Sequence, residues 1–321
     1  MLRVLAYHRV ANGVQSSTLT PRLISATPDN FREQVAYLAR HYDVVSMAEV
    51  LEALQYRRRL SPRSVLVTFD DAYVDFKKTA WPILREHRFP ATLFVPTAYP
   101  DHPERGFWWD RLWRAIMGTS QTVLRGRRME VPIESPEDRR MGLPKLHTYI
   151  KSLPHKEAMA FVDRICAFCG EIPSDQRTVL NWSELRELVR EGVTLGAHTR
   201  THPILTRLSL PKARIEIRGS QEDLHRKIGK VFPIFSYPNG AYNETILRVM
   251  REEGFLLSVT SEDGFNNLES VDALRLRRIN ITPRTTLAIF RLRLLRLSTY
   301  VGGWRHPIQR LANAISSGRA Q

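Results

Sequence analysis

Two cysteines, Cys166 and Cys169, are all that the 321 residues contain. Two thiols cannot form the disulfide framework of a small secreted domain. A structural zinc site needs four ligands, and the sequence has no second cysteine pair to complete one. Because the two cysteines have the spacing of neighbours on one face of a helix, we expect ordinary packing thiols rather than a redox or metal site.

An apolar leader sequence is missing as well, since the chain opens with MLRVLAYH, which predicts a strand. No uncharged apolar run approaches the ~20 residues that are needed to cross a bilayer. Low-complexity tracts are also missing, and the hydrophobic fraction of 43% is enough for a sizeable core. We therefore expect a folded protein that stays in the cytoplasm.

Acidic residues are missing from Arg275 to Gln321, a stretch that holds ten arginines in a chain of formal net charge +15. Apolar residues recur there at helical spacing, at Leu287, Phe290, Leu294 and Leu297. A basic amphipathic helix of this kind can make peripheral contact with an anionic membrane at its inner face. We favour the alternative, a helix that packs its apolar stripe on the protein and leaves its arginines in water. Nucleic acid is not an expected partner, because no recognised binding motif accompanies the charge.

Apolar runs alternate with amphipathic segments along most of the chain. We expect seven strands, at residues 3–7, 64–69, 91–95, 193–197, 233–236, 255–259 and 274–279. Helical patterns lie between them, at residues 29–42, 47–57, 73–88, 183–191, 211–229 and 243–253. Such alternation indicates parallel strands joined by right-handed crossovers. The fold class is therefore α/β, and about seven units predict a distorted or incomplete (β/α)7 barrel.

Residues 100–178 interrupt this alternation with Pro-rich, charged and aromatic segments that contain no clear strand. We expect a mainly helical insertion that lies over one end of the barrel. Its tryptophans, at positions 108, 109 and 113, can stack on sugars or anchor the insertion, and we favour anchoring. The predicted organisation is a barrel over residues 1–283, which includes the insertion, and a basic amphipathic C-terminal segment over residues 284–321.

Reactive side chains stand where four of the expected strands end, which is the face where parallel barrels carry their active sites. Asp70 and Asp71 follow the second strand, and two adjacent carboxylates are costly to bury unless a cation or a shared proton compensates. The alternative is an aspartate pair that caps the next helix. His8 ends the first strand, where a general acid can sit.

His198 and His202 follow another expected strand, four residues apart. Two such imidazoles can bind one metal ion, and with one carboxylate they make a usual catalytic metal set. Either histidine alone would more often be structural. The segment at residues 236–240, Ser-Tyr-Pro-Asn-Gly, has turn chemistry after a strand, so it either aims a backbone N–H into the site or forms a plain tight turn.

Together these motifs resemble the polysaccharide deacetylase family, also called the NodB-homology domain or carbohydrate esterase family 4. TFDD at 68–71, HTRTHP at 198–203 and SYPNG at 236–240 resemble its first three motifs. The opening YHRV at 7–10 and the FWWD at 107–110 resemble a bacterial branch found in surface-polysaccharide clusters. The resemblance covers most of residues 1–283.

The resemblance implies a role for several residues. Asp71, His198 and His202 would hold one divalent metal ion, usually zinc, with cobalt or nickel able to substitute. Asp70 would be the general base, aided by a metal that lowers the pKa of bound water toward ~7. The backbone N–H of Asn239 would help to stabilise the tetrahedral oxyanion.

Three features depart from the common pattern of the family. The late-chain histidine that many members use as an acid is missing, and in the resembling branch the N-terminal histidine fills this role, here His8. Ser236 stands in place of the arginine that pairs with the base, and Arg278 can substitute for it. Ala72 replaces a glycine, which would cost ~1–2 kcal/mol if the backbone there is left-handed.

The function that the resemblance implies is metal-dependent hydrolysis of an N-acetyl or other N-acyl group on an amino sugar. The substrate would be a glycan or a lipid-linked saccharide, as in a polysaccharide or glycolipid precursor. Two alternatives stay open. One is a non-catalytic carbohydrate-binding protein with the same fold, and the other is a deformylase or another hydrolase of non-peptide C–N bonds.

Overall fold

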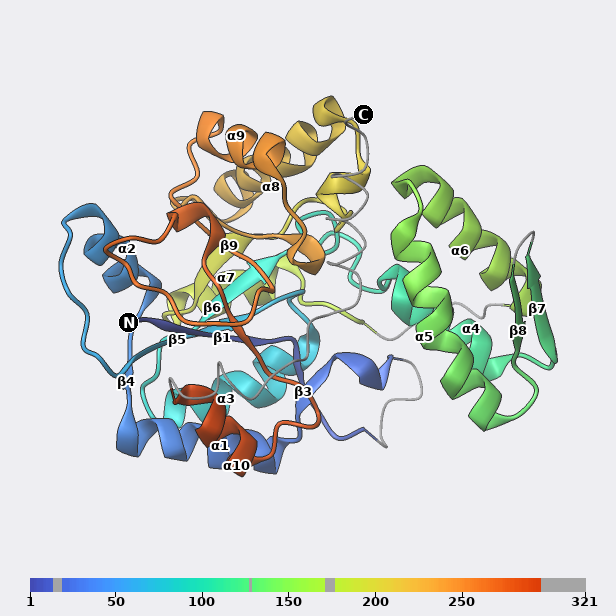
Figure 1. Cartoon of the computed structure of the whole chain (residues 1–321), viewed down its shortest axis with the longest axis horizontal. Coiled ribbons are helices and arrows are strands. Elements are labelled where there is room, and N and C mark those ends of the chain that lie inside the picture. The colour runs from blue at the N-terminus through green and yellow to red at the C-terminus, as the bar shows by residue number, and fades with distance from the viewer. Residues whose placement is uncertain (14–18, 127–128, 171–176, 296–321) are drawn as a thin grey trace, which may run out of the picture.

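A curled parallel sheet forms the centre of the computed structural model, which describes residues 1–13, 19–126, 129–170 and 177–295 (Figure 1). Its strands run in the order β11-β10-β9-β6-β5-β1-β12, and β4 pairs with β5 off this path. The strands are β1 (Arg3–Tyr7), β4 (Asp43–Val44), β5 (Ser64–Phe69), β6 (Thr92–Val95), β9 (Thr194–Ala197), β10 (Ile234–Ser236), β11 (Leu257–Val259) and β12 (Ile279–Asn280). All pairs in this sheet are parallel, which confirms the predicted α/β half-barrel.

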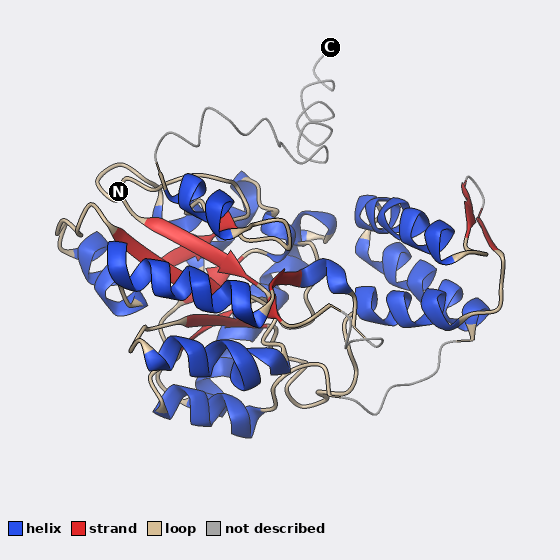
Figure 2. Cartoon of the chain, turned by 90° about the horizontal axis from the view of Figure 1, so that it is seen from below, coloured by secondary structure: helices blue, strands red, loops and turns tan. Residues whose placement is uncertain are grey.

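Helices surround the sheet (Figure 2). Most of them pack on its outer face, and the helix at Met47–Gln55 packs on the opposite face. They are α1 (Pro28–His41), α2 (Met47–Gln55), α3 (Trp81–Glu86), α7 (Trp182–Arg190), α8 (Leu210–Ile228) and α9 (Glu244–Glu252). One turn of π-helix, Phe76–Ala80, precedes α3. Side-chain caps fix two of the helix starts, since Thr27 accepts a hydrogen bond from the Asn30 amide of α1 and Ser46 forms a capping box with Glu49 in α2.

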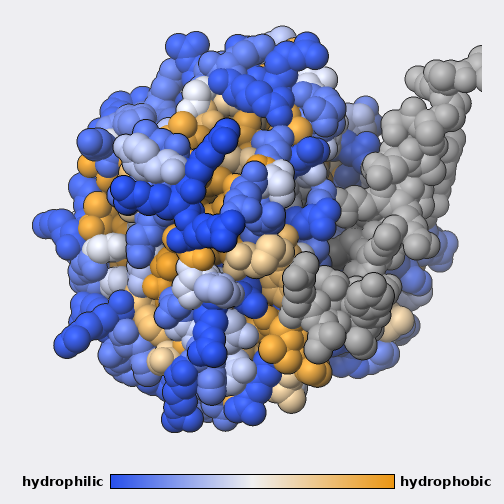
Figure 3. Space-filling view, turned by 60° about the vertical axis from the view of Figure 1, so that its left-hand side comes forward, coloured by the Kyte–Doolittle hydropathy of each residue, from blue (hydrophilic) through white to orange (hydrophobic). Residues whose placement is uncertain are grey.

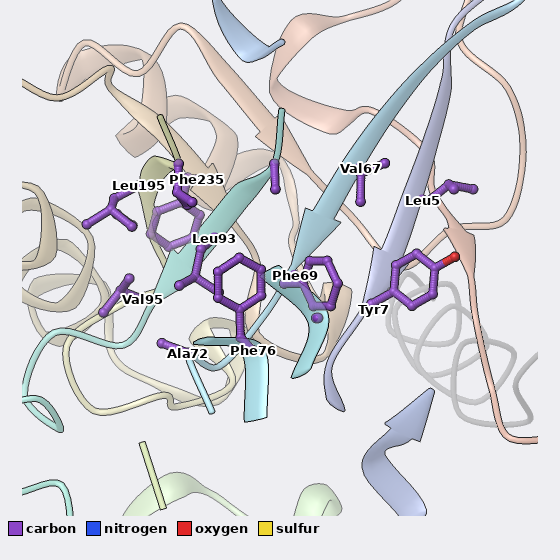
Figure 4. Close-up of a cluster of buried hydrophobic side chains, with 14 of the residues drawn as sticks. Leu5, Tyr7, Val67, Phe69, Ala72, Phe76, Leu93, Val95, Leu195 and Phe235 are labelled. Atoms are coloured by element: carbon purple, nitrogen blue, oxygen red, sulfur yellow. The ribbon is translucent and has the colours of Figure 1, made fainter. Parts of the chain in front are cut away.

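Strand β5 shows why the strands of this sheet have continuous apolar runs in the sequence. Val65, Val67 and Phe69 point into the core beneath the helices, and Leu66 belongs to the cluster on the opposite face. Figure 4 shows the helix-facing side, where alternate residues of β1, β5, β6 and β9 stand in a row. Because both faces are covered, every residue of β5 is buried. The same alternation places Thr68 on the inner face, where Arg278 contacts it.

The strand predicted at residues 274–279 is wrong for most of its length. Asp272 accepts a hydrogen bond from the Leu274 amide and caps a 3-10 turn at Ala273–Arg275, and β12 begins only at Ile279. Leu276 makes a single parallel bridge to Val259 at the end of β11. The apolar alternation here reflects burial beside the sheet rather than regular strand pairing.

The insertion forms a lobe beside the barrel, beyond the carboxyl ends of its strands (Figures 1 and 2). It contains α4 (Trp108–Gly118), an antiparallel hairpin of β7 (Val123–Gly126) and β8 (Met129–Pro132), α5 (Pro136–Ser152) and α6 (His155–Cys169). The hairpin was not expected from the sequence, whose arginine-rich segment shows no clean alternation. Cys166 and Cys169 pack in the apolar core of this lobe, on one face of α6.

A last described helix, α10 (Leu287–Leu294), packs on the barrel beside α1. It buries Phe290 and Leu294, and the Arg291 guanidinium lies 4.9 Å from the centre of the Tyr37 ring. Leu297 lies outside the described residues, as does everything after residue 295, so the separate C-terminal segment stays a prediction. None of the described helices is long and apolar enough to cross a membrane. Figure 3 shows hydrophobic residues exposed among hydrophilic ones on one flank of the barrel.

Candidate active site

The reactive side chains predicted from the sequence meet at the carboxyl ends of the parallel strands. All seven of them line one cavity of about 150 Å³ that opens toward the inserted lobe. They are His8 after β1, Asp70 and Asp71 after β5, His198 and His202 after β9, Asn239 after β10, and Arg278 directly before β12. The topology brings together the residues that follow strands, because these strands run in the same direction. Arg278 precedes its strand and joins them through its side chain, which contacts Asp70.

Asp71, His198 and His202 converge on a single point. The Oδ1 atom of Asp71 lies 3.5 Å from Nε2 of His198 and 3.3 Å from Nε2 of His202. The two Nε2 atoms are 3.1 Å apart. One ligand atom from each of the three residues therefore lies within 4.8 Å of the others. An imidazole pair with one carboxylate is the donor set of many catalytic zinc sites.

The environment of His198 fixes which ring nitrogen faces this point. Its Nδ1 lies 2.6 Å from the Ser236 carbonyl oxygen, which can only accept a hydrogen bond. Nδ1 therefore carries the proton, and Nε2 presents a lone pair toward Asp71. Asp71 is 2% exposed, and among the described residues its Oδ1 atom has no hydrogen-bond donor. A buried carboxylate oxygen without a donor beside two imidazole lone pairs fits a divalent cation.

The backbone around the three residues is strained. Asp71 has φ of 74° and His202 has φ of 59°, both in the left-handed region that favours glycine. The Thr199 hydroxyl accepts a hydrogen bond of 3.0 Å from the His202 amide and holds that turn. Non-glycine residues with positive φ cluster at functional sites, where the surrounding structure enforces them.

Ala72 is also left-handed, with φ of 51°, so the glycine that the family pattern has here would avoid strain. Its methyl group is completely buried in the core beneath the helices. Burial of that methyl group offsets part of the strain. The departure from the pattern is therefore a local cost in stability and leaves the position of Asp71 intact.

Asp70 forms a bidentate ion pair with Arg278. The guanidinium donates from Nη1 to Oδ1 at 2.9 Å and from Nη2 to Oδ2 at 2.7 Å. Ser236 adds a hydroxyl donor 3.2 Å from Oδ2, and the Thr260 carbonyl accepts from Nε of Arg278 at 2.7 Å. A guanidinium therefore lies on the predicted base even though Ser236 stands in the usual arginine position.

This ion pair decides the charge of Asp70. Burial by itself would raise the pKa of the carboxyl, but the adjacent Arg278 guanidinium outweighs it and holds the pKa below its ordinary value. Asp70 is therefore ionised at neutral pH. Burial acts the other way on His202 and lowers its pKa to about 3, so that this imidazole is neutral and able to bind a cation.

Trp109 and its neighbours connect the insertion to His202. The Trp109 ring meets the His202 ring edge to face, with centroids 4.9 Å apart. Its Nε1 donates to the Tyr73 hydroxyl at 2.8 Å, and that hydroxyl donates to Oδ2 of Asp110 at 2.8 Å. The Thr20 amide donates to the other oxygen of Asp110. Trp109 thus makes the predicted anchoring contacts, and both Trp108 and Trp109 line the cavity.

Several cavity residues were not predicted from the sequence. Lys151 of α5 donates from Nζ to Oδ1 of Asn239 at 2.6 Å, and His147 lies one turn earlier on the same helix. Arg22 reaches the cavity from the 3-10 turn at Pro21–Leu23, and Arg207 from the turn at Leu205–Arg207. His147 and Lys151 are four residues apart, and this spacing is the signal that could have placed them on one face of a helix.

Comparison with known proteins finds a matching family and several relatives. A family described as polysaccharide deacetylase matches residues 57–134 and 145–257. YxkH of Bacillus subtilis (strain 168), provisionally named a polysaccharide deacetylase, is 21% identical over 283 residues, which are 88% of this chain and 72% of YxkH. The poly-beta-1,6-N-acetyl-D-glucosamine N-deacetylase of Escherichia coli (strain K12) is 31% identical over 93 residues, 29% of this chain and 14% of that protein.

Solved structures share the fold. The deacetylase PplD of Streptococcus pyogenes, in complex with acetate, has a TM-score of 0.62 at 21% identity, over 92% of this chain and 98% of PplD. IcaB of Ammonifex degensii has a TM-score of 0.60 at 18% identity, over 92% of this chain and 97% of IcaB. At these identities the likeness is one of architecture, and it includes most of the described chain.

Proposed function

The chain belongs to the polysaccharide deacetylase family, whose members are hydrolases of amide C–N bonds, and we propose that it removes an N-acetyl or other N-acyl group from an amino sugar of a glycan or glycolipid precursor. The observation that carries the proposal is the convergence of Asp71, His198 and His202 beside the ionised Asp70. The Escherichia coli relative is named for N-acetylglucosamine in a polymer, which supports an amino sugar as substrate.

Asp71, His198 and His202 would hold one divalent metal ion, and zinc suits two imidazoles and a carboxylate, with cobalt or nickel as substitutes. When bound, such an ion supplies Lewis acidity and lowers the pKa of water toward ~7. The remaining work belongs to the side chains of this chain. The Ser236 carbonyl keeps His198 in the tautomer that can bind, and Trp109 holds the ring of His202.

Asp70 is placed to act as the general base. Its carboxylate is ionised and held by two hydrogen bonds from Arg278, so it can take a proton from the water that attacks the acyl carbon. The backbone N–H of Asn239, at a left-handed turn on the cavity, would donate to the oxyanion that develops on the carbonyl oxygen.

His8 would complete the reaction as general acid. It is half-buried on the cavity at the end of β1, where its backbone N–H donates to the Ser25 hydroxyl at 2.9 Å. Its ring would give a proton to the nitrogen as the C–N bond breaks, so that the amine leaves neutral and the acyl group leaves as a carboxylate. A cytoplasmic location stays a prediction, as does contact with the inner membrane face.

The direct test is acyl release. Zinc-loaded protein should release acetate or formate from at least one member of a panel of nucleotide-linked, lipid-linked and oligomeric N-acyl amino sugars. Acetate would identify a deacetylase, and formate alone would identify the deformylase alternative. Sugar binding without release, by protein that carries one metal ion per chain, would contradict the proposal and leave a non-catalytic binding protein. His225→Ala, at an exposed histidine on α8, is a control that should retain activity.

A further inference from the structure

A cationic wall, formed by the insertion and by two loops of the barrel, lines the cavity beside the strand ends. It consists of Arg22, Lys151 and Arg207, together with the neutral His147. Arg22 and Arg207 are exposed at the mouth, Lys151 is half-buried, and His147 is buried. Positive charge therefore extends from the mouth toward the strand ends, an arrangement that attracts anions into a cleft.

In the part of the chain that the structure describes, no carboxylate makes direct contact with this wall, although the charge of Asp71 acts on Lys151 through space. Among the described residues, none of its three cations forms an ion pair with an aspartate or glutamate, although most other pairs on the surface join an arginine to an acid. The carboxylates that line the cavity are Asp70 and Asp71, and Arg278 already neutralises Asp70. The cavity thus carries excess positive charge before any metal ion binds.

The pKa of Lys151 reflects both its burial and this excess of positive charge. Burial, and then the nearby charge of Arg22, lower the pKa of its ammonium group to about 8. Among the described residues, the hydrogen-bond partner of its Nζ is the neutral side-chain oxygen of Asn239. Cations that lack a counter-charge inside a cleft are stabilised when a ligand supplies the negative charge.

His147 adds an unsatisfied donor at the same place. Nη1 of Arg22 lies 3.4 Å from its Nδ1, and a guanidinium can only donate, so Nδ1 accepts and Nε2 carries the proton. Burial lowers the pKa of His147 to about 3, which keeps the ring neutral. The ring is 7% exposed, and among the described residues its Nε2 has no partner. An anionic oxygen of a ligand would supply the acceptor that this buried N–H lacks.

We propose that the amino sugar bears a phosphoryl group next to its N-acyl group, and that Arg22, Lys151 and His147 bind the phosphoryl oxygens. The proposal rests on the proposed function, because it names the substrate class of the same site. A phosphoryl group presents several oxygens in different directions, which suits donors from two separate elements better than the planar pair of a carboxylate does.

Lys151 also sets the distance between the two groups. Its Nζ binds the side chain of Asn239, whose backbone N–H would face the oxyanion. The phosphoryl group must therefore lie on an atom close to the acylated nitrogen. A 2-acylamino sugar phosphorylated at its anomeric carbon satisfies this, since the two carbons are neighbours. Nucleotide sugars and sugars on an isoprenoid phosphate share this chemistry.

Apolar side chains also line the cavity next to the cationic wall, including Leu153 and Met159. They provide a surface for the part of the substrate beyond the phosphoryl group, be it nucleoside or isoprenoid. The identity of this carrier is an arm of the experiment, because either carrier delivers the same sugar phosphate to the wall.

The test compares kcat/KM of the zinc-loaded protein on five substrates. These are N-acetylglucosamine 1-phosphate, its uridine diphosphate derivative, its short isoprenyl phosphate derivative, a neutral N-acetylglucosamine oligomer and a disaccharide with a uronic acid. The phosphorylated sugars should be preferred, and Lys151→Met should lower kcat/KM on them by roughly 10- to 100-fold more than on the neutral oligomer. Arg22→Gln should likewise lower kcat/KM more on the phosphorylated sugars than on the neutral oligomer. Lys145→Met, at an exposed lysine on the same helix as Lys151, should leave kcat/KM unchanged on both the phosphorylated sugars and the neutral oligomer.

Calorimetry on the zinc-loaded Asp70→Asn variant provides a readout without turnover, and thermal melts confirm that each variant folds. The variant should bind N-acetylglucosamine 1-phosphate at least 10-fold more tightly than N-acetylglucosamine. Equal binding would overturn the phosphoryl assignment even if no substrate were hydrolysed. Faster hydrolysis of the neutral oligomer or the uronate would overturn it while the proposed function stood. Absence of acyl release from all five, together with tight sugar phosphate binding, would contradict the proposed function alone.

Discussion

The strand ends of the barrel and the cationic wall beside them differ in how their polar groups are satisfied. At the strand ends three reactive groups have fixed neighbours: Arg278 holds Asp70, the Ser236 carbonyl holds His198, and Trp109 packs on His202. On the wall, Lys151 has only a neutral partner and His147 keeps an unpaired N–H among the described residues. We infer from this difference that the strand ends position the reacting groups, whereas the cationic wall contacts the substrate.

This comparison separates two classes of variant. Changes at the strand ends should remove activity on every substrate, because they affect the reacting atoms or the groups that hold them. Changes on the wall should alter the preference between substrates. The loss should be largest at Asp70 and should diminish for residues that only support the reacting groups.

The largest effect is expected from Asp70→Asn. The amide cannot accept the proton from water, so kcat should fall roughly 10²- to 10⁴-fold on every substrate while the bound metal stays. Rate measurements with metal analysis would check this. Asp163→Asn, at an exposed aspartate of α6, is the matched control and should behave like the wild type. Loss of metal together with activity would show that Asp70 is a ligand rather than the base.

Arg278→Gln should come next, because it leaves the carboxylate of Asp70 buried without its charged partner. Breaking a buried ion pair in this way costs about 3–5 kcal/mol of stability. The variant should lose this amount in urea unfolding at neutral pH and lose activity on all substrates in parallel. Arg277→Gln, at the neighbouring and largely exposed arginine, is the control. A variant with unchanged activity would remove Arg278 from the catalytic arrangement.

Asp110 offers a pH test of the contact between barrel and insertion. Burial raises the pKa of its carboxyl to about 6, above the ~3.9 of an unfolded chain. A raised carboxyl pKa means that its contribution is fully present below the unfolded pKa and declines as pH rises through the folded one. Wild-type stability should therefore fall relative to Asp110→Asn between about pH 4 and 6, by roughly 3 kcal/mol or less. Urea titrations at several pH values would show it, and parallel curves would contradict it.

The smallest effect is expected from Ala72→Gly. Glycine would relieve about 1–2 kcal/mol of left-handed strain but lose a buried methyl group and gain unfolded-state entropy. These terms nearly cancel, so the free energy of unfolding should change by about 1 kcal/mol or less, with unchanged metal binding. A large change of either sign, measured by urea unfolding, would show that Ala72 positions Asp71 directly.

Much of the strand framework could be predicted, and the same physical reason applies to each strand. Strands buried on both faces give apolar runs such as β5, and reactive residues follow directly after them, as Asp70 and His198 do. The strand predicted at 274–279 failed because Leu274 and Leu276 are buried without regular pairing. The hairpin of β7 and β8 was missed because its alternation is short and charged.

The cationic wall could not be predicted as a whole because no local pattern joins its parts. The spacing of Lys151 and His147 pairs them on one helix, but only tertiary packing brings that helix and the turn that carries Arg22 to the same cavity. Arg278 was reached through the resemblance to the family branch, and the structure places it on Asp70. Residues that act through the tertiary fold, rather than through spacing along the chain, are the ones that the sequence hides.

The most direct test of the account is the zinc content of purified protein, measured by mass spectrometry for the wild type and for Asp71→Ala, His198→Ala and His202→Ala. The account predicts one zinc ion per wild-type chain and far less than one in each variant, with His225→Ala retaining a full complement. A wild-type chain without zinc after exposure to excess metal, or variants that retain the same zinc as the wild type, would contradict the claim that these three side chains hold one cation.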